Sequence, residues 1–339
     1  MVRASSRRTF LTEASSLAVL GSCATVAALA RTGPTHISIA NASGGLNLTM
    51  AALMRQQKLL ESFGLDPEVI AVADGTRVLG GIVGGSVDAT FMSGFGQVFP
   101  AVERGAGVKI LAGGALLPVL ALFSAKPGVK ALKDLEGRTI GSGSIGSLVY
   151  QLTVTLLQKY QVNLSHIRFV NIGSSSDVFR SVSAGAVDAG VGDAALISEA
   201  ARYGVHLVDH GDMSVELKEY TYQGAWASDR KIASERDTIV RGLAAYAQLY
   251  RFVQRADSRE AFLRARRSAF ANAPESDHEA LWNYIQAYKP FAVDLKLSPE
   301  RLRYMQELNV GFKVQSAVLS FDRVADMSLA ADALKLLNG

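Results

Sequence analysis

The sequence predicts an α/β protein made of two copies of one unit, followed by a helical C-terminal part. Short β-branched segments alternate with amphipathic segments along the first two thirds of the chain. The motif Gly-x-Val-Asp-Ala occurs twice, at 85–89 and 185–189. After about Tyr222 the alternation gives way to successive amphipathic segments. Strands that alternate with helices favour a mainly parallel sheet with helices on both faces.

The duplication extends beyond the repeated motif. Upstream, matching residues recur at a constant offset: Ile39 and Ile140, Ser43 and Ser144, and Gly45 and Gly146. Downstream, residues 107–111 resemble residues 204–208. Three matched regions in the same order indicate two copies of one unit rather than a chance repeat.

Each copy is expected to run from a β-branched strand through a Ser/Gly turn into an amphipathic helix, and then to two further strands. In the first copy we expect a strand at 36–40, a turn at 43–45, a helix at 48–63, a strand at 67–71 and a third strand through 87–89. In the second copy we expect a strand at 138–140, a turn at 142–147, a helix at 148–160, a strand at 167–171 and a third strand through 187–189. Helices are expected afterwards at 235–255, 258–270, 275–287, 299–308 and 322–337.

The Ser/Gly turns that follow the first strands predict a ligand cleft. In open α/β sheets, ligands bind beyond the carboxyl ends of the strands, near helix N-termini. Glycine permits close backbone approach, serine offers hydroxyl donors, and the helix dipole favours negative charge. We expect a small organic anion there, such as a sulfonate or a carboxylate. The predicted ligand-binding residues are Ser43, Gly44, Gly45, Ser93, Gly94, Ser142, Gly143, Ser144, Ser147, Ser174, Ser175 and Asp193. Each serine alone is equally well explained as a helix cap.

Two charged residues bear on the ligand's chemistry. Arg77, in Asp74-Gly75-Thr76-Arg77, is the candidate counter-charge for an anion, with an exposed helix start as its alternative. Asp193 would oppose an anion unless it accepts a hydroxyl or amine of the ligand. Zwitterionic and pyrimidine ligands therefore stay open.

Catalytic and metal-binding motifs receive little support. Gly141-x-Gly143-x-x-Gly146 matches a dinucleotide fingerprint, but Asn171 stands where that fingerprint requires an acidic residue. The sequence contains neither a phosphate-binding loop nor a nucleophile elbow. We expect no catalytic residue and no cofactor.

The histidines and the repeated aspartates also favour structural roles. His206 and His210 are the one pair with metal-like spacing, and they fall in a predicted strand-to-loop segment rather than on a helix. Asp88 and Asp188 are expected to be structural residues at strand starts, because both copies repeat them. We expect no metal site.

Composition excludes several classes of protein. The 339 residues are 49% apolar and 19% charged, which excludes a disordered chain. A formal charge of +4 is too weak for a nucleic-acid-binding protein. The single cysteine excludes a disulfide framework. The longest apolar run, 110–123, contains two glycines and Pro118, which favours buried core over a membrane span.

Residues 1–30 resemble a secretory signal. Arg7-Arg8 precede an apolar stretch that ends in Ala28-Leu29-Ala30, as in a twin-arginine signal, so we expect a periplasmic protein. Cys23 follows Leu20-Gly21-Ser22, which resembles a lipoprotein cleavage box, and a lipid anchor through Cys23 is the alternative.

In chain order, these features resemble the nitrate/sulfonate/taurine/thiamine-precursor class of ABC-transporter substrate-binding proteins. The most specific segment is Asp134-Leu135-Glu136-Gly137-Arg138-Thr139-Ile140-Gly141, and the similarity spans residues 36–209. The resemblance implies a type II periplasmic-binding fold, in which two α/β lobes joined by two crossover strands close on a ligand like a hinge. It places lobe I at 35–123 plus 223–339 and lobe II at 124–222. Trp226, just after the return crossover, would line the cleft or pack at the hinge.

The resemblance also implies a function. A solute-binding protein of this class delivers a small molecule to an ABC permease in the inner membrane, and we expect a monomer that binds no nucleic acid. The alternatives are a binder of a pyrimidine or other aromatic or zwitterionic nutrient, an exported enzyme, and a sensor that docks on a receptor. Eukaryotic relatives include a thiamine-pyrimidine synthase with a cysteine-rich iron motif. That enzyme is disfavoured because Cys23 is the chain's one cysteine.

Overall fold

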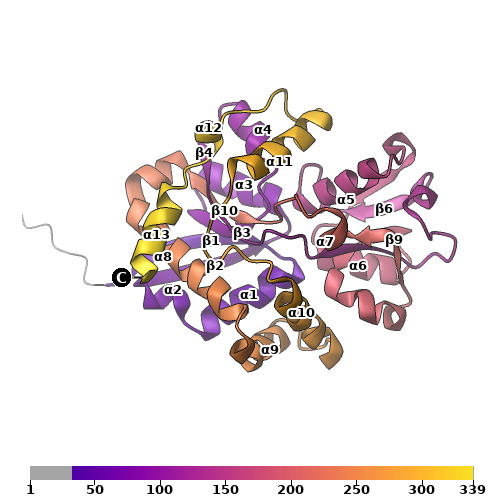
Figure 1. Ribbon diagram of the computed structural model, residues 1–339, viewed down its shortest axis with the longest axis horizontal. Coiled ribbons are helices and arrows are strands. Elements are labelled where there is room, and N and C mark those ends of the chain that lie inside the picture. The colour runs from indigo at the N-terminus through magenta and orange to yellow at the C-terminus, as the bar shows by residue number, and fades with distance from the viewer. Residues whose placement is uncertain (1–32, 339) are drawn as a thin grey trace, which may run out of the picture. The chain divides into compact units, whose positions relative to one another are not determined.

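The computed structural model describes residues 33–338 and contains two five-stranded sheets (Figure 1). The first sheet has the strand order β2-β1-β3-β10-β4, and the second has the order β7-β6-β8-β5-β9. The first contains β1 (Thr35–Ala42), β2 (Leu65–Val72), β3 (Ala89–Ser93), β4 (Val108–Gly113) and β10 (Gly224–Ser228). The second contains β5 (Leu120–Ser124), β6 (Thr139–Ser142), β7 (Arg168–Asn171), β8 (Ala189–Asp193) and β9 (His206–Asp212). The signal expected at residues 1–30, with Cys23, lies outside the described residues.

The two sheets have equivalent topologies. In the first, β1 pairs in parallel with β2 and β3, and β10 runs antiparallel to β3 and β4. In the second, β6 pairs in parallel with β7 and β8, and β5 runs antiparallel to β8 and β9. The chain therefore crosses between the sheets twice, from β4 to β5 and from β9 to β10. The predicted type II periplasmic-binding fold is confirmed.

Helices pack on both sheets and form the C-terminal part. The first sheet carries α1 (Gly45–Gln56), α2 (Leu59–Ser62), α3 (Gly75–Gly84) and α4 (Val98–Glu103), and we call this assembly lobe I. The second carries η1 (Leu132–Leu135), α5 (Leu148–Lys159), η2 (Leu164–His166), α6 (Ser175–Ser183), η3 (Ala194–Tyr203) and α7 (Met213–Glu216), and we call it lobe II. The C-terminal elements are α8 (Asp229–Val253), η4 (Ala256–Ser258), α9 (Arg259–Ala269), α10 (Glu275–Tyr288), α11 (Pro299–Gly311), α12 (Phe321–Val324) and α13 (Ser328–Asn338).

The C-terminal helices join the lobes into one compact unit that begins at Gly33. Helix α9 packs along α1, and α13 packs along α8, as Figure 1 shows. Helix α10 packs against η3 of lobe II. Strand β5 begins at Leu120, so the lobe boundary expected between residues 123 and 124 crosses this strand. The return boundary expected at 222–223 falls just before β10.

The repeated Gly-x-Val-Asp-Ala motif has the same structural role in both lobes. The Asp88 carboxylate accepts the backbone N–H of Ser38 on β1 at 2.8 Å, and the Asp188 carboxylate accepts that of Thr139 at the start of β6 at 2.8 Å. The preceding Gly85 has a φ of +80°, a left-handed conformation that ends α3 and that other residues adopt only with strain. The prediction of a structural role for the two aspartates is confirmed.

Three expected helices differ in their extent. The helix expected at 48–63 is divided into α1 and α2, because Lys58 adopts a left-handed φ of 51°. Helix α8 begins at Asp229, earlier than expected, because Ser228 caps it, and its backbone leaves the helical conformation at Glu235. The last helix is divided because Ala325 pairs with Ile110 of β4. At these positions helix capping and tertiary contacts, rather than the periodicity of apolar residues, decide where the helices begin and end.

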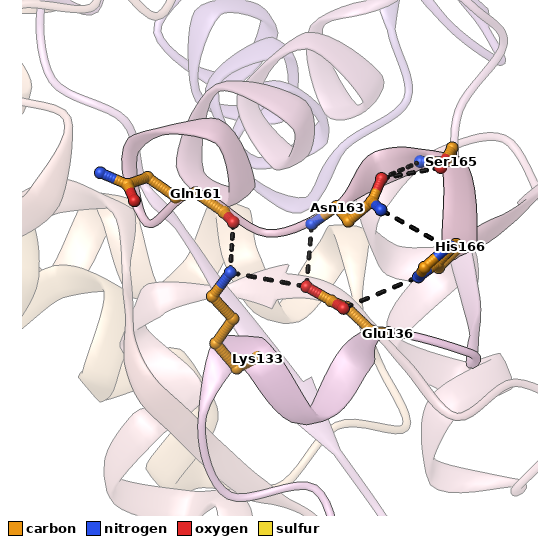
Figure 2. A network of polar contacts seen from close by, with 6 residues as sticks. All are labelled: Lys133, Glu136, Gln161, Asn163, Ser165 and His166. Atoms are coloured by element: carbon orange, nitrogen blue, oxygen red, sulfur yellow. Dashed lines mark hydrogen bonds and ion pairs between the residues drawn. The ribbon is translucent and has the colours of Figure 1, made fainter.

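The Asp-Leu-x-Gly segment, residues 134–137, forms a turn just before β6. Glu136 lies at the centre of the polar network in Figure 2, where it accepts the backbone N–H of Asn163 at 2.9 Å. Its carboxylate also lies 3.5 Å from Lys133 Nζ and 3.8 Å from His166 Nδ1. The Asn163 N–H lowers the pKa of Glu136 by stabilising its charged form. The network ties the segment before β6 to the loop that follows α5.

Within residues 33–338, no helix is both long and apolar enough to span a lipid bilayer. The apolar run at 110–123 forms most of β4 and β5, and both strands lie in the core.

Replacement of either repeated aspartate should destabilise the fold. Asp88→Ala or Asp188→Ala should lower the free energy of unfolding by about 1.5–3 kcal/mol, because each removes a hydrogen bond between a charged acceptor and a strand N–H. Urea unfolding measures the change. The control is Asp66→Ala, whose side chain is 68% exposed and which should change stability by less than about 0.5 kcal/mol. Equal effects of all three substitutions would refute the structural role.

Candidate functional site

The N-termini of four helices meet at one small cavity between the lobes. Gly44, Asp74, Ser147 and Ser174 are the N-cap residues of α1, α3, α5 and α6. All four line a cavity of about 30 Å³, which we call the inner cavity. A helix N-terminus carries unpaired N–H groups and partial positive charge, which favour an anionic group, and at α3 the Asp74 carboxylate already fills this role. The inner cavity has room for about one water molecule, so an organic ligand requires the lobes to separate.

The four helices differ in how their first N–H groups are satisfied. Asp74 accepts from two N–H groups of its own helix at 3.0 and 3.1 Å. Ser147 and Ser174 each accept one, at 3.4 and 3.2 Å. Gly44 offers no side chain, so α1 has no side-chain cap. The first turn of α1 is therefore the one whose donors are most available to a ligand.

A second, outer cavity of about 480 Å³ adjoins the inner one and shares Ala73 and Asp74 with it. Ser144 of lobe II lies in its wall and donates a hydrogen bond of 2.7 Å to the Asp74 carboxylate of lobe I. Arg77 also lines this cavity, is exposed, and makes no side-chain hydrogen bond or ion pair within residues 33–338. Its guanidinium is available to an anionic group of a ligand.

The turns of the two lobes differ in length. Ile39 pairs with Ala89, and Ile140 pairs with Ala189, so the two first strands are in register. The N-cap follows Ile39 by five residues in lobe I and follows Ile140 by seven in lobe II. Ser43 and Ser144 each follow the matched isoleucine by four residues, but Ser43 immediately precedes its N-cap and Ser144 lies three residues before its own. The longer turn carries Ser144 across to Asp74.

A buried ion pair joins the lobes beside α1. The Asp193 carboxylate at the end of β8 lies 3.5 Å from Arg266 Nη2, and the two side chains are 8% and 5% exposed. Arg266, on α9, also donates to Thr49 Oγ1 at 3.0 Å. A Cβ atom on Gly45 would lie 2.4 Å from Asp193 Oδ2, so the carboxylate rests directly on the first turn of α1. Burial raises the pKa of Asp193, and Arg266 acts in the opposite direction.

Six of the predicted site residues line the two interlobe cavities, and the other eight line neither. Gly44, Ser147, Ser174 and Ser175 line the inner cavity, and Arg77 and Ser144 line the outer one. The residues that line neither are Ser43, Gly45, Ser93, Gly94, Ser142, Gly143, Asp193 and Trp226. Of these, Trp226 is fully buried in β10, and Gly94 packs against Leu148 of the other lobe.

Two residues that sequence reasoning did not identify line the inner cavity with unsatisfied acceptors. The Asn47 amide donates to the backbone oxygens of Ala42 and Met92, at 2.8 and 3.1 Å, and its buried Oδ1 has no partner among residues 33–338. Within the same residues, the buried Gln223 Oε1 also has no partner. A buried unsatisfied acceptor costs about 1–3 kcal/mol, which a ligand donor would recover. The position of Asn47 in the first turn after Gly44 was the available sequence signal.

The comparisons with known proteins agree with this fold. Residues 61–257 match the family described as NMT1/THI5 like. The alkanesulfonate-binding protein SsuA from Xanthomonas axonopodis pv. citri, bound to MOPS, is 18% identical with a TM-score of 0.70, over 89% of this chain and 98% of that one. The periplasmic nitrate-binding protein NrtA from Synechocystis is 9% identical with a TM-score of 0.71, over 90% and 89% of the two chains. No curated protein sequence matches the chain.

The same fold also occurs in an enzyme. The desulfurization enzyme DSZB is 14% identical with a TM-score of 0.60, over 89% of this chain and 99% of that one. At these identities the similarities show the fold alone, and the choice between a binding protein and an enzyme depends on the site.

The contact between Gly45 and Asp193 should be sensitive to a single methyl group. Gly45→Ala should lower the free energy of unfolding by about 1–3 kcal/mol, because its Cβ would overlap the Asp193 carboxylate. In an Asp193→Ala background the same change should cost much less, and a double-mutant cycle measures this coupling. Gly80→Ala is the control, because a Cβ there meets no atom within 4 Å. Additive effects of the two substitutions would show that the lobes do not meet at this point.

Proposed function

The chain belongs to the NMT1/THI5-like family, and we propose that it is a solute-binding protein of an ABC importer that takes a small organic anion between its two lobes. The observation that carries this proposal is the meeting of four helix N-termini at one interlobe cavity. Anionic groups bind at helix N-termini through unpaired N–H donors and the helix dipole. The binding proteins for alkanesulfonate and nitrate, which share this fold, support the same class of ligand.

The ligand's anionic group would bind between the first turn of α1 and Arg77. Helix α1 has no side-chain cap, and Arg77 has no partner within the described part of the chain. Ser147 would add a hydroxyl donor from lobe II, while Ser144 donates to Asp74 across the cleft. Binding would begin on one lobe of an open cleft, and closure would then bring the second set of donors to the ligand.

Closure would also assemble the form that docks on a permease. Two contacts join the two sides of the cleft: Ser144 donates to Asp74, and Asp193 pairs with Arg266. Both would form when the lobes approach each other. We propose that the closed monomer is the species recognised by an inner-membrane permease. The export signal at residues 1–30 would place the protein in the periplasm, by the twin-arginine route or, alternatively, anchored through a lipid on Cys23.

A second class of ligand is favoured by the unpaired acceptors. In the described part of the chain, Asn47 Oδ1 and Gln223 Oε1 accept no hydrogen bond, and they would suit a zwitterionic or pyrimidine ligand with N–H donors. An exported enzyme and a sensor are the remaining alternatives, because the fold is shared with an enzyme. Prolonged incubation with a stabilising compound separates an enzyme from a binding protein, since only an enzyme would convert the compound.

The experiment combines native mass spectrometry of copurified ligand with a thermal-shift screen of sulfonates, carboxylates and pyrimidines. One chemical group should stabilise the protein, because ligand binding to the native state raises stability. For an anionic ligand, Arg77→Gln should raise Kd by about 10–100-fold, which corresponds to the loss of about 1.5–3 kcal/mol from a charge-assisted hydrogen bond. Ser144→Ala should weaken binding less.

The matched control is Arg168→Gln, an exposed arginine of β7 that lines neither interlobe cavity. Its affinity should equal that of the wild type. No stabilising compound in a broad screen would contradict the binding function. An unchanged Kd for Arg77→Gln would contradict the anion site while leaving binding intact.

A further inference from the structure

A third cavity lies within lobe I, between α1, α2 and β2, and it goes beyond the interlobe function proposed above. Its volume is about 430 Å³, which is within the range of small-molecule sites. Tyr246 of α8 and Ala269 of α9 complete its wall, and no residue of lobe II lines it. It meets the inner cavity only through Ala42 and Asn47, which line both. We call it the lobe I cavity.

The walls of the lobe I cavity are mainly apolar. Side chains from α1, α2 and β2 form this surface: Leu48, Ala51, Ala52, Met54, Leu60, Pro67, Val69, Ile70 and Ala71. The alanines of α1 and β2 leave space that longer side chains would fill. Val69 is 43% exposed although it is a large apolar residue. Burial of such a surface against an apolar ligand is favourable by about 25 cal/mol per Å².

One polar group in the wall has a free proton. Tyr246 is 3% exposed, and its hydroxyl oxygen accepts a hydrogen bond of 3.3 Å from Asn41 Nδ2. Asn41 Oδ1 accepts a hydrogen bond of 3.1 Å from Thr90 Oγ1, which places the Asn41 amide nitrogen toward Tyr246. The Tyr246 hydroxyl proton has no acceptor among residues 33–338. Its ring is held in place by stacking on Phe91, with ring centroids 4.9 Å apart.

The ionisation state of Tyr246 keeps that donor in place. Burial raises the pKa of Tyr246 to about 12, so the hydroxyl stays protonated at neutral pH. A ligand acceptor beside it would satisfy a buried donor that now has none. This single donor inside an apolar wall sets the orientation of a bound molecule.

The charged residues of the cavity lie at its exposed rim and not among its apolar walls. Arg55, Glu61 and Asp66 line it with charges of both signs, so no single charge is favoured at the opening. An ionised group placed among the apolar walls would lose its hydration without a buried counter-charge. We propose that the lobe I cavity binds a neutral, mainly apolar small molecule with one hydrogen-bond acceptor, which accepts the Tyr246 hydroxyl proton.

The test uses the full chain with two probes that differ by one hydroxyl group, 4-methylphenol and toluene, and follows their binding by backbone amide NMR shifts. Both probes should shift resonances of the lining residues, for example Ala51 and Ala71, with 4-methylphenol bound more tightly. Tyr246→Phe should reduce the affinity for 4-methylphenol by about 2–10-fold, the loss expected for one neutral hydrogen bond, and leave toluene unaffected. Tyr288→Phe, at a tyrosine that is 47% exposed, is the matched control and should change neither affinity.

A second variant protects the test against a folding defect. Ala51→Leu should fill the cavity and abolish binding of both probes, while a cooperative urea unfolding transition shows that the variant is folded. Absence of binding of either probe by the wild type at millimolar concentration would overturn the proposal. It would also be overturned by shifts confined to the inner cavity at Ser147 and Ser174, or by equal losses for both probes in Tyr246→Phe.

Discussion

In each lobe, an aspartate just before the third strand forms a hydrogen bond to the first strand, and the arrangement of the ligand site depends on this bond. Asp88 accepts the N–H of Ser38, and Asp188 accepts the N–H of Thr139. These bonds fix the register of the first strand against the third, so that their carboxyl ends finish at the same level. Helices α1 and α5 follow these first strands, and α3 and α6 follow β2 and β7, which pair in parallel with the first strands. The N-termini of these four helices therefore meet where the lobes face each other.

The chemistry of the cleft follows from how those N-termini are capped. A side-chain oxygen already satisfies part of the first turn of α3, α5 and α6, whereas glycine leaves α1 without a side-chain cap. The carboxylate nearest to that turn, Asp193, is neutralised by Arg266. The positive end of α1 therefore remains available to a ligand anion even though a buried aspartate lies beside it. The desolvated pair also explains why Asp193 does not need a cationic ligand as its partner.

The sequence allowed the fold to be predicted in detail because the decisive signals were local and repeated. The duplicated motif marked the third strands, and the Ser/Gly turns marked helix starts. Ser147 and Ser174 were found because capping residues are recognisable from their type. Arg266 was not identified as a site residue, because its helix is distant in sequence and reaches Asp193 only through packing on α1. The division of the helix at Lys58 depends on backbone geometry, and the cavity position of Asn47 depends on tertiary contacts. The periodicity of apolar residues in the sequence predicts neither.

The interface between the lobes combines close contacts with energy terms that oppose each other. Glycine at position 45 lets Asp193 touch α1, and Gly94 lets Leu148 approach lobe I. The Asp193–Arg266 pair gains Coulomb energy on closure, but both groups lose their hydration, so the net gain of such a buried pair is small. The unsatisfied acceptors of Asn47 and Gln223 further oppose closure without a ligand. In the proposed mechanism, a ligand would shift the equilibrium between open and closed lobes only by its difference in affinity for the two states, so these opposing terms would set how much binding energy closure requires.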